Sequence, residues 1–322
     1  MQKGSHKGDG GSGGEGKTKM PQLVWYAAQN GNDANDGQSE ATPLATVSKA
    51  LALIKTGYNE NREDGRTATI VIDGTIRGSG NYNTSKSMIE ISGAGNYPPI
   101  ILKGGKSGGV LDANVPDDGD GRIMYIDNNH VTLESGLVLR GGHSIYGGAV
   151  IIGGHGSESA GEFIMRGGEI SGNSAALGGA VMIYNGSFKL SGGIIKNNHS
   201  AKTFSAEKLK GAAVYVCGGA TFYMEGGEIK NNGNTDTDEG GGVAVDERGV
   251  FNMKGGYMSQ NTAKNGGAVY IESLATFTIT AGIVSGNIAE AGGGVYVSDY
   301  GAKLSENGGT ITGNTPDDVY RK

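Results

Sequence analysis

One short segment recurs six times in the second half of the chain and constrains the fold more than any other feature. Each copy has two small residues, then Ala or Gly, then Val and two further residues. Because a unit this short cannot bury its own apolar face, such repeats indicate a solenoid in which neighbouring units stack. The copies occupy residues 147–152, 178–183, 211–216, 240–245, 266–271 and 292–297.

Two further segments follow each copy, and both alternate apolar and other residues with the period of a β-strand. The first of these segments carries a pair of apolar residues. The second begins at a small residue and ends at an Asn six positions later. The pattern predicts an all-β protein, a parallel β-helix with three sheets and one coil per repeat. The pairs are Phe163/Met165, Phe188/Leu190, Phe222/Met224, Phe251/Met253, Phe277/Ile279 and Ala302/Leu304, and the Asn residues are Asn173, Asn198, Asn232, Asn261, Asn287 and Asn314.

The two series predict two columns along the solenoid. Five of the six Phe residues share one repeat position and are expected to stack inside, whereas the Asn amides are expected to bond one another at a turn. Gly accounts for 62 of the 322 residues, which fits tight bends with positive φ.

Composition excludes several classes of protein and partner. A single Cys, Cys217, allows no internal disulfide framework, and no His pair has metal-ligand spacing. The formal net charge is −6, so the chain has no excess of basic residues and a nucleic-acid partner is not expected. No window is apolar enough for a transmembrane segment.

The sequence divides into three parts. Residues 1–20 are predicted to form a flexible Gly-rich tether. Residues 21–66 are predicted to form an entry segment with a capping helix at 44–55. Residues 67–322 are predicted to form the β-helix, and its coils before about residue 142 are imperfect. The P-loop-like pattern at 11–18 lacks a flanking strand and helix. No evident cap follows Asn314, where the polar tail could fold over the last coil.

The repeats resemble known families. The six segments, each after a Gly-Asn or Asn-Asn turn, resemble the right-handed parallel β-helix repeats of polymorphic outer-membrane proteins and related bacterial surface proteins. The opening at 26–33, with Pro43 and Thr46, resembles the entry segment of pectate-lyase-like proteins. The resemblance and the Gly-rich tether together imply an extracellular or cell-surface location, although no signal peptide is visible. The tether would also suit attachment through a lipidated N-terminal Cys that is absent from this sequence. The resemblance allows polysaccharide lyases, glycoside hydrolases and non-catalytic adhesins.

Turn residues explain the enzyme-like motifs equally well, and the sequence assigns no catalytic residue. The segments 154–156 and 234–236 and the pair Asp117-Asp118 resemble the tripeptides and acid pair of polygalacturonase-type hydrolases, but they lie on separate coils. A lyase would need Ca²⁺, the one cofactor considered, held by acids in 112–120 or 236–239, and a base such as Arg122 or Arg140.

The outward residue of each first segment gives the candidate ligand site. These residues are expected to form a flat strip in which Tyr rings stack on a ligand, with the alternative that they only stabilise the strands. The loops 199–210 and 233–239 are expected on adjacent coils. The residues assigned to ligand binding are Met182, Tyr215, Tyr270 and Tyr296, and the strip also contains Ile151 and Ala244.

Three functions therefore stay open. The first is a non-catalytic surface protein that binds glycans or host and partner proteins, the second is a polysaccharide lyase or glycoside hydrolase, and the third is a structural spacer. Gly, Asn, Ser and Thr crowd the turns, where an enzyme would be expected to concentrate Asp, Arg, Lys and His. This composition favours the first function.

Overall fold

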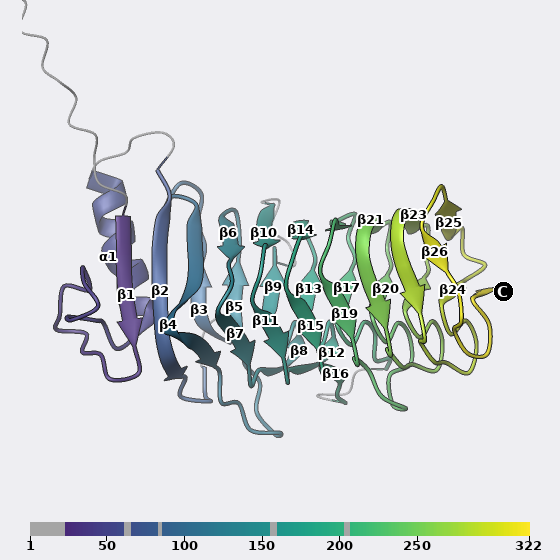
Figure 1. Cartoon of the computed structure of the whole chain (residues 1–322), viewed down its shortest axis with the longest axis horizontal. Helices are drawn as coiled ribbons and strands as arrows, with labels where there is room; N and C mark the ends of the chain where they lie inside the picture. The colour runs from purple at the N-terminus through teal and green to yellow at the C-terminus, as the bar shows by residue number, and fades with distance from the viewer. Residues whose placement is uncertain (1–22, 61–65, 83–85, 155–159, 203–206) are drawn as a thin grey trace, which may run out of the picture.

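A computed structural model describes residues 23–60, 66–82, 86–154, 160–202 and 207–322. The chain forms a parallel β-solenoid of about 8 turns with three parallel sheets (Figure 1). This confirms the predicted β-solenoid and its three sheets. The tether 1–20 and the P-loop-like pattern lie outside the described residues.

Sheet B contains the first segment of every repeat, as predicted. Its nine strands pair in parallel, coil on coil. They are β3 (Ser87–Ile91), β5 (Arg122–Ile126), β9 (Val150–Ile152), β13 (Val181–Ile183), β17 (Val214–Val216), β20 (Val243–Val245), β22 (Val269–Ile271), β24 (Val295–Val297) and β27 (Val319–Arg321).

Sheet A contains both the second and the third segments, which were expected in separate sheets. They merge because some strands run through both segments and bend at a Gly corner such as Gly256 without breaking. Its 15 strands are β1 (Leu23–Ala28), β2 (Ala68–Arg77), β4 (Ile100–Asp112), β6 (His130–Leu133), β7 (Leu137–Arg140), β10 (Gly161–Met165), β11 (Glu169–Ser171), β14 (Gly186–Leu190), β15 (Ile194–Lys196), β18 (Thr221–Met224), β19 (Glu228–Lys230), β21 (Val250–Ser259), β23 (Thr276–Ser285), β25 (Lys303–Glu306) and β26 (Thr310–Ile311).

Sheet C is short and was not predicted as a strand region. Two of its strands follow Asn173 and Asn198, and the third follows Gly142 at the equivalent position. Its strands are β8 (His143–Tyr146), β12 (Ser174–Leu177) and β16 (His199–Ser200).

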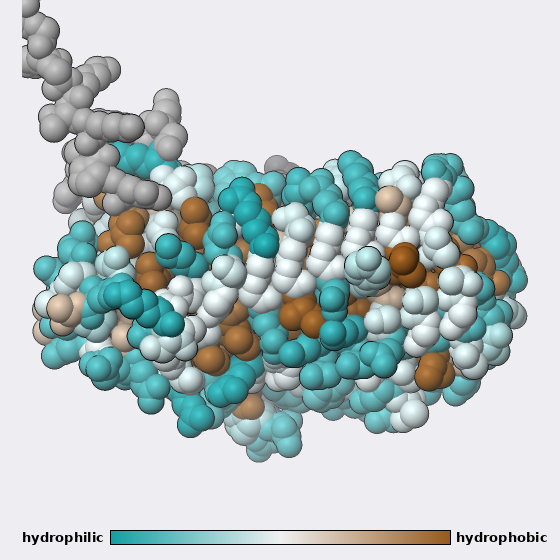
Figure 2. Space-filling model, viewed as in Figure 1, coloured by the Kyte–Doolittle hydropathy of each residue, from teal (hydrophilic) through white to brown (hydrophobic). Residues whose placement is uncertain are grey.

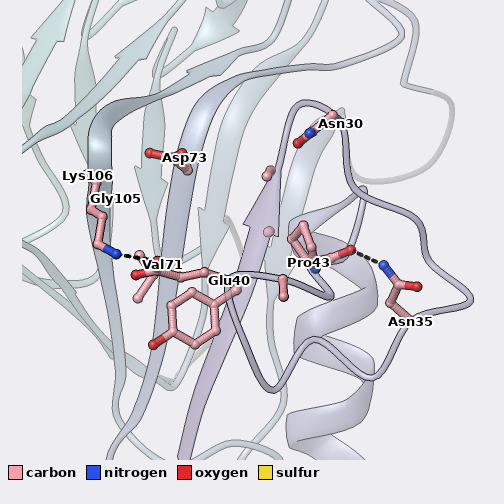
Figure 3. Close-up of a pocket in the computed structure, with 12 residues that line it drawn as sticks. Asn30, Asn35, Glu40, Pro43, Val71, Asp73, Gly105 and Lys106 are labelled. Atoms are coloured by element: carbon pink, nitrogen blue, oxygen red, sulfur yellow. Dashed lines mark hydrogen bonds and ion pairs between the residues drawn. The ribbon is translucent and has the colours of Figure 1, made fainter.

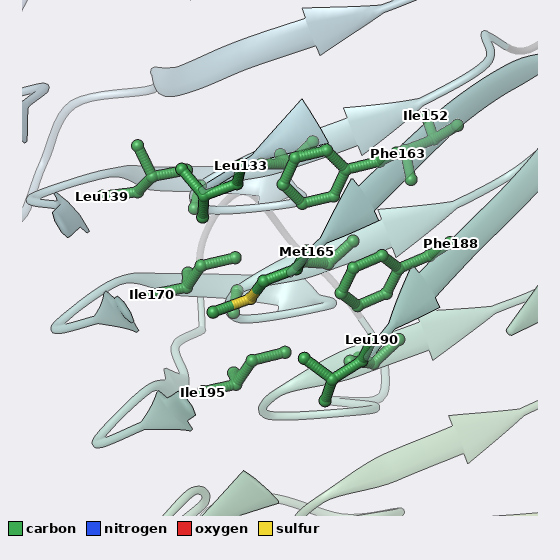
Figure 4. Packing of buried hydrophobic residues seen from close by; sticks show 14 of the residues in the cluster. Leu133, Leu139, Ile152, Phe163, Met165, Ile170, Phe188, Leu190 and Ile195 are labelled. Atoms are coloured by element: carbon green, nitrogen blue, oxygen red, sulfur yellow. The ribbon is translucent and has the colours of Figure 1, made fainter. Parts of the chain in front are cut away.

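The predicted Phe column exists. Rings of successive coils stack with centroids 4.6–5.2 Å apart, and every ring is fully buried. Figure 4 shows Phe163 and Phe188 one above the other, with Met165 and Leu190 stacked beside them. In the last coil the predicted register was wrong by two residues, since Leu304 lies opposite Phe277 and the exposed Glu306 lies opposite Ile279. The column therefore ends at Leu304.

The Asn ladder is also confirmed. Each side chain is buried, and from Asn198 onward each Oδ1 accepts both the backbone N–H and the amide of the Asn one coil before, at 2.9–3.1 Å. At the start of the ladder, Asn173 Oδ1 accepts the backbone N–H of Gly142. At the end, Asp318 Oδ1 takes the place of the next Asn and accepts both bonds from Asn314. The tail does fold back, and it supplies the ladder's missing acceptor.

The N-terminal helix, α1 (Val47–Glu60), begins later and ends later than the predicted 44–55. Thr46 accepts the backbone N–H of Lys49 as an N-cap, while Leu44 forms a bridge to Ala27 instead of a helical turn. The apolar face of α1 is buried against the first coils, beside β1 in Figure 1. Within the described residues, no helix has the length and apolarity needed to span a membrane.

Candidate functional site

The outward residues of sheet B form one continuous column, as predicted. The register places Ile151, Met182 and Tyr215 side by side, and Ala244, Tyr270 and Tyr296 continue the row. They form an apolar cluster separate from the solenoid core, because alternate residues of each strand point to opposite faces. We call this row the outer column.

The outer column points away from the core, as predicted, but it is largely covered. Met182 and Tyr215 are each only 5% exposed, Tyr270 is 6% exposed and Tyr296 is 9% exposed. The rings of Tyr270 and Tyr296 do stack, with centroids 5.1 Å apart. Neighbouring side chains on the same outer face cover the column, so a ligand can reach it only where those neighbours leave room.

Two flanking columns provide the cover, and neither was predicted from the sequence. One contains the residues two positions after the outer column, which the alternation of the strands could have indicated. The other contains the residue directly before each small pair, a recognisable repeat position. The first flank is Gly153, Tyr184, Cys217, Asp246, Glu272 and Ser298, and the second is Tyr146, Leu177, Lys210, Glu239, Asn265 and Ala291.

The flanks are apolar beside the central strands β9, β13 and β17 of sheet B, and there they leave a cavity of about 280 Å³, which we call the groove. It brings two of the four predicted ligand residues together, whereas Tyr270 and Tyr296 do not line it. Tyr146 is 44% exposed, and Glu247 is the charged residue among the lining. The groove is lined by Tyr146, Ile151, Leu177, Met182, Tyr184, Tyr215, Cys217 and Glu247.

One coil further along, the flanks become charged. Lys210 Nζ lies 2.9 Å from Glu239, 2.8 Å from Asp246 and 2.9 Å from Glu272. Burial alone would lower the pKa of Lys210, but these carboxylates outweigh it and raise that pKa. The hydroxyl of Tyr215 donates to Asp246 at 3.3 Å, which joins this ion cluster to the groove.

The small Ala244 explains why the cluster lies there. It stands in the outer column between Tyr215 and Tyr270, where a longer side chain would occupy the space above sheet B. Lys210 bridges carboxylates from both flanks at this coil, so a salt-bridge network takes the place of a side chain in the column.

The floor of the groove is neutral but lies in a negative field. Burial raises the pKa of the Cys217 thiol to about 12, and the charges of Glu247 and Asp246 add to that rise. Burial raises the pKa of Tyr215 as well, again with both carboxylates contributing. Because a thiol reacts as its thiolate, Cys217 is a packing residue and not a nucleophile.

A second cavity, of about 340 Å³, lies where the entry segment meets β1, β2 and β4 (Figure 3). Its polar side chains are largely engaged with protein groups. Glu40 reaches Lys106 at 2.6 Å, Asp73 accepts the backbone N–H of Ser107 at 2.8 Å, and Asn35 donates to the carbonyl of Pro43. Unlike the groove, this entry cleft carries several polar and charged side chains, and its apolar lining is Tyr26, Pro43, Val71 and three Ala residues.

The two long loops lie on adjacent coils, as predicted, and line a cleft of about 580 Å³. Asp238 connects them, since it accepts the backbone N–H of Leu209 and pairs with Lys264 at 2.7 Å. Residues 203–206 of the first loop lie outside the described residues.

The residues considered for lyase or hydrolase chemistry are engaged structurally. Asp112 pairs with Arg140 at 3.2 Å, and the buried Arg122 donates to Ser144 and to the carbonyl of Tyr146. Asn234 Oδ1 accepts three bonds within its own turn. His155 lies outside the described residues. Across the described ranges, no group of three or more His, Cys, Asp or Glu residues has an arrangement that could hold a metal ion.

These features define a three-sheet parallel β-solenoid whose outer face carries one apolar groove beside one ion cluster. Figure 2 shows another face of the same solenoid as mostly hydrophilic, with separate apolar patches. No protein-family model, no curated protein and no solved structure matches the chain.

Proposed function

We propose that this chain is a non-catalytic binding protein of the cell surface, adhesin-like, and that the groove beside Met182 and Tyr215 receives its ligand. The groove is the single observation that carries the proposal. Concave apolar sites with a few polar groups are the usual form of ligand sites.

The alternatives have less support. A lyase or hydrolase needs carboxylates and a base that converge on an open site, but Asp112 and Arg140 pair with each other and Asp238 pairs with Lys264. A pure spacer would need only a uniform exterior. The outer column is uniform neither in residue type nor in cover, which favours a binding role over a spacer role.

The surface location and the right-handed winding belong to the same proposal. Both follow from the resemblance of the repeats to bacterial surface β-helix proteins. Right-handed winding also agrees with the strong general preference for right-handed connections between parallel strands.

A charge placed in the groove tests the proposal. Leu177 lines the groove and shares its repeat position with Lys210, so the coil can accommodate a lysine there. Leu177→Lys should weaken binding of any groove ligand by about ten-fold, because the charge loses water when the ligand covers it. Ala291→Lys makes the same change at the same repeat position far from the groove, and should leave binding unchanged.

The ligands for this test come from a glycan array and from a random-peptide display library, each probed with the wild-type protein. A ligand that loses affinity on Leu177→Lys but not on Ala291→Lys supports the proposal. Wild-type ligands that bind both variants equally well would contradict it. Release of unsaturated uronates from polyuronate with Ca²⁺ would favour the lyase instead.

A further inference from the structure

Resting on the proposed function, we propose that the ligand is a segment of a partner protein that places an apolar side chain in the groove and a basic group at its rim. The inference rests on the chemistry of the lining, the position of Glu247 and the electrostatics of the floor. It goes beyond binding as such, because it names the ligand class and excludes acidic polysaccharides.

The size and the lining favour one large side chain. The cavity of about 280 Å³ lies at the small end of ligand pockets, which span roughly 300–1,000 Å³. Its walls are Ile151, Leu177, Met182 and Tyr rings, and the hydroxyl of Tyr215 is already bonded to Asp246. Most hydroxyls of a sugar chain would face apolar walls and would lose their hydrogen bonds to water without gaining others. An aromatic or aliphatic side chain avoids this loss of binding free energy.

The rim supplies a negative charge. Glu247 is exposed and lines the groove, and no ion pair of its carboxylate is found within the described ranges. The same charge, together with Asp246, contributes to the raised pKa of Cys217 on the floor. A cation beside the apolar group would therefore be attracted, whereas a uronate would be repelled.

The backbone of the turn that carries Glu247 has a left-handed conformation in three successive coils. Glu247 and Arg248 have φ of 47° and 64°, a left-handed conformation that suits Gly. The equivalent positions are Gly218 and Gly219 in the coil before, and Ser273 and Leu274, with φ of 49° and 66°, in the coil after. The conformation therefore belongs to the turn of the solenoid. At the coil of the groove this turn places the Glu247 carboxylate at the rim.

Three related probes separate this inference from the proposed function. Indole is neutral, tryptamine adds a cation and indole-3-acetate adds an anion, while the aromatic body stays the same. We expect indole to bind the groove, with tryptamine tighter by about three-fold and indole-3-acetate weaker by a similar factor. Added salt should reduce the preference for tryptamine and leave indole unchanged. Calorimetry or ligand-observed NMR measures all three.

The three probes distinguish failure of the groove as a binding site from failure of the charge preference. If indole fails to bind, or binds Leu177→Lys as well as the wild type, the groove itself is contradicted. If indole binds but tryptamine and indole-3-acetate bind equally well, only the inference about charge is overturned. Glu247→Gln should abolish the difference between the two charged probes, whereas Glu306→Gln, an exposed carboxylate at the far end, should preserve it.

Blocked tetrapeptides extend the test to a protein ligand. Gly-Trp-Lys-Gly should bind the wild type and compete with tryptamine, and Gly-Trp-Glu-Gly should bind about ten-fold less well, because its charge has the wrong sign. Equal affinity of the two peptides would overturn the proposal. A neutral glycan that displaces tryptamine from the wild type but not from Leu177→Lys would overturn it in favour of a sugar ligand.

Discussion

The inner Phe column and the outer column run along the same coils in register, yet they follow different rules. The inner column repeats one residue type through five coils, and every ring is sealed from water. The outer column changes from Ile to Met, Tyr and Ala before it returns to Tyr. A close-packed interior tolerates no gap, so it fixes its residues. An outer face tolerates gaps between side chains. At one coil Lys210 fills such a gap, and at another coil the gap stays open as the groove.

The largest expected effect is on the inner column. Phe222→Ala should lower the free energy of unfolding by about 4 kcal/mol, since the ring is fully buried between two others and a cavity would remain. Met182→Ala should cost about 1–2 kcal/mol, because Met182 already borders an open groove. Chemical denaturation of both variants measures the two costs. Equal losses of unfolding free energy in the two variants would contradict the distinction between a sealed inner column and an outer column that borders a gap.

The ion cluster should be the next most sensitive part. Lys210→Met leaves Glu239, Asp246 and Glu272 without their shared cation, and should cost about 3 kcal/mol at neutral pH. Lys208→Met removes a half-exposed lysine from the same cluster and should cost less than about 1 kcal/mol. Thermal or denaturant unfolding of the two variants would contradict the account if the two costs were alike.

The pH dependence of the same cluster has a definite sign. The lowered pKa of Asp246 gives stability that is present above its ordinary value of 3.8 and lost as pH falls through the folded value. The raised pKa of Lys210 gives stability that is present below 10.5 and lost as pH rises further. In Lys210→Met the unpaired carboxylates should have raised pKa values, so that variant should gain stability as pH falls from 7 towards 4. A parallel pH profile of wild type and variant would contradict this.

The Asn ladder should show a smaller but specific effect. Asn232→Ala removes bonds to Asn198, Asn261 and two backbone carbonyls, and should cost about 2–3 kcal/mol. Asn252→Ala, on the outer face of β21, should cost less than about 0.5 kcal/mol. Chemical denaturation of both variants measures the loss of unfolding free energy. Equal losses at Asn252 and Asn232 would show that the ladder stabilises the fold no more than an ordinary surface Asn does.

The smallest effect on stability is expected at the rim. Glu247→Gly relieves a left-handed backbone at a turn, so stability should change by less than about 1 kcal/mol in either direction. The variant should nevertheless lose the preference for cationic probes. A large loss of stability would mean that Glu247 is a structural residue of the turn.

Most of the solenoid could be predicted from the sequence because stacking repeats a contact that one repeat already contains. The Phe column, the Asn ladder and the outer column follow from residue spacing alone. The merging of the second and third segments could not, because a Gly pair can either end a strand or bend it, as at Gly256. The C-terminal register at Leu304 was missed because the last coil carries Glu306 at a core position.

The candidate site was predicted only in part. The sequence indicated which residues point outward, and Met182 and Tyr215 do line the groove. It did not indicate their burial, because cover depends on side chains from two other repeat positions, such as Leu177 and Tyr184. Glu247 gave no signal in the sequence, since a carboxylate in a turn is ordinary unless its backbone conformation is known.

The measurement that tests the central claim most directly is methyl NMR of the protein with its 9 Met residues labelled, titrated with tryptamine. Met182→Leu assigns the Met182 signal. The account predicts that the Met182 methyl shifts saturably, while the methyls of the sealed core residues Met165, Met224 and Met253 stay in place. A titration in which Met182 is silent, or in which the core methionines shift as much, would contradict it.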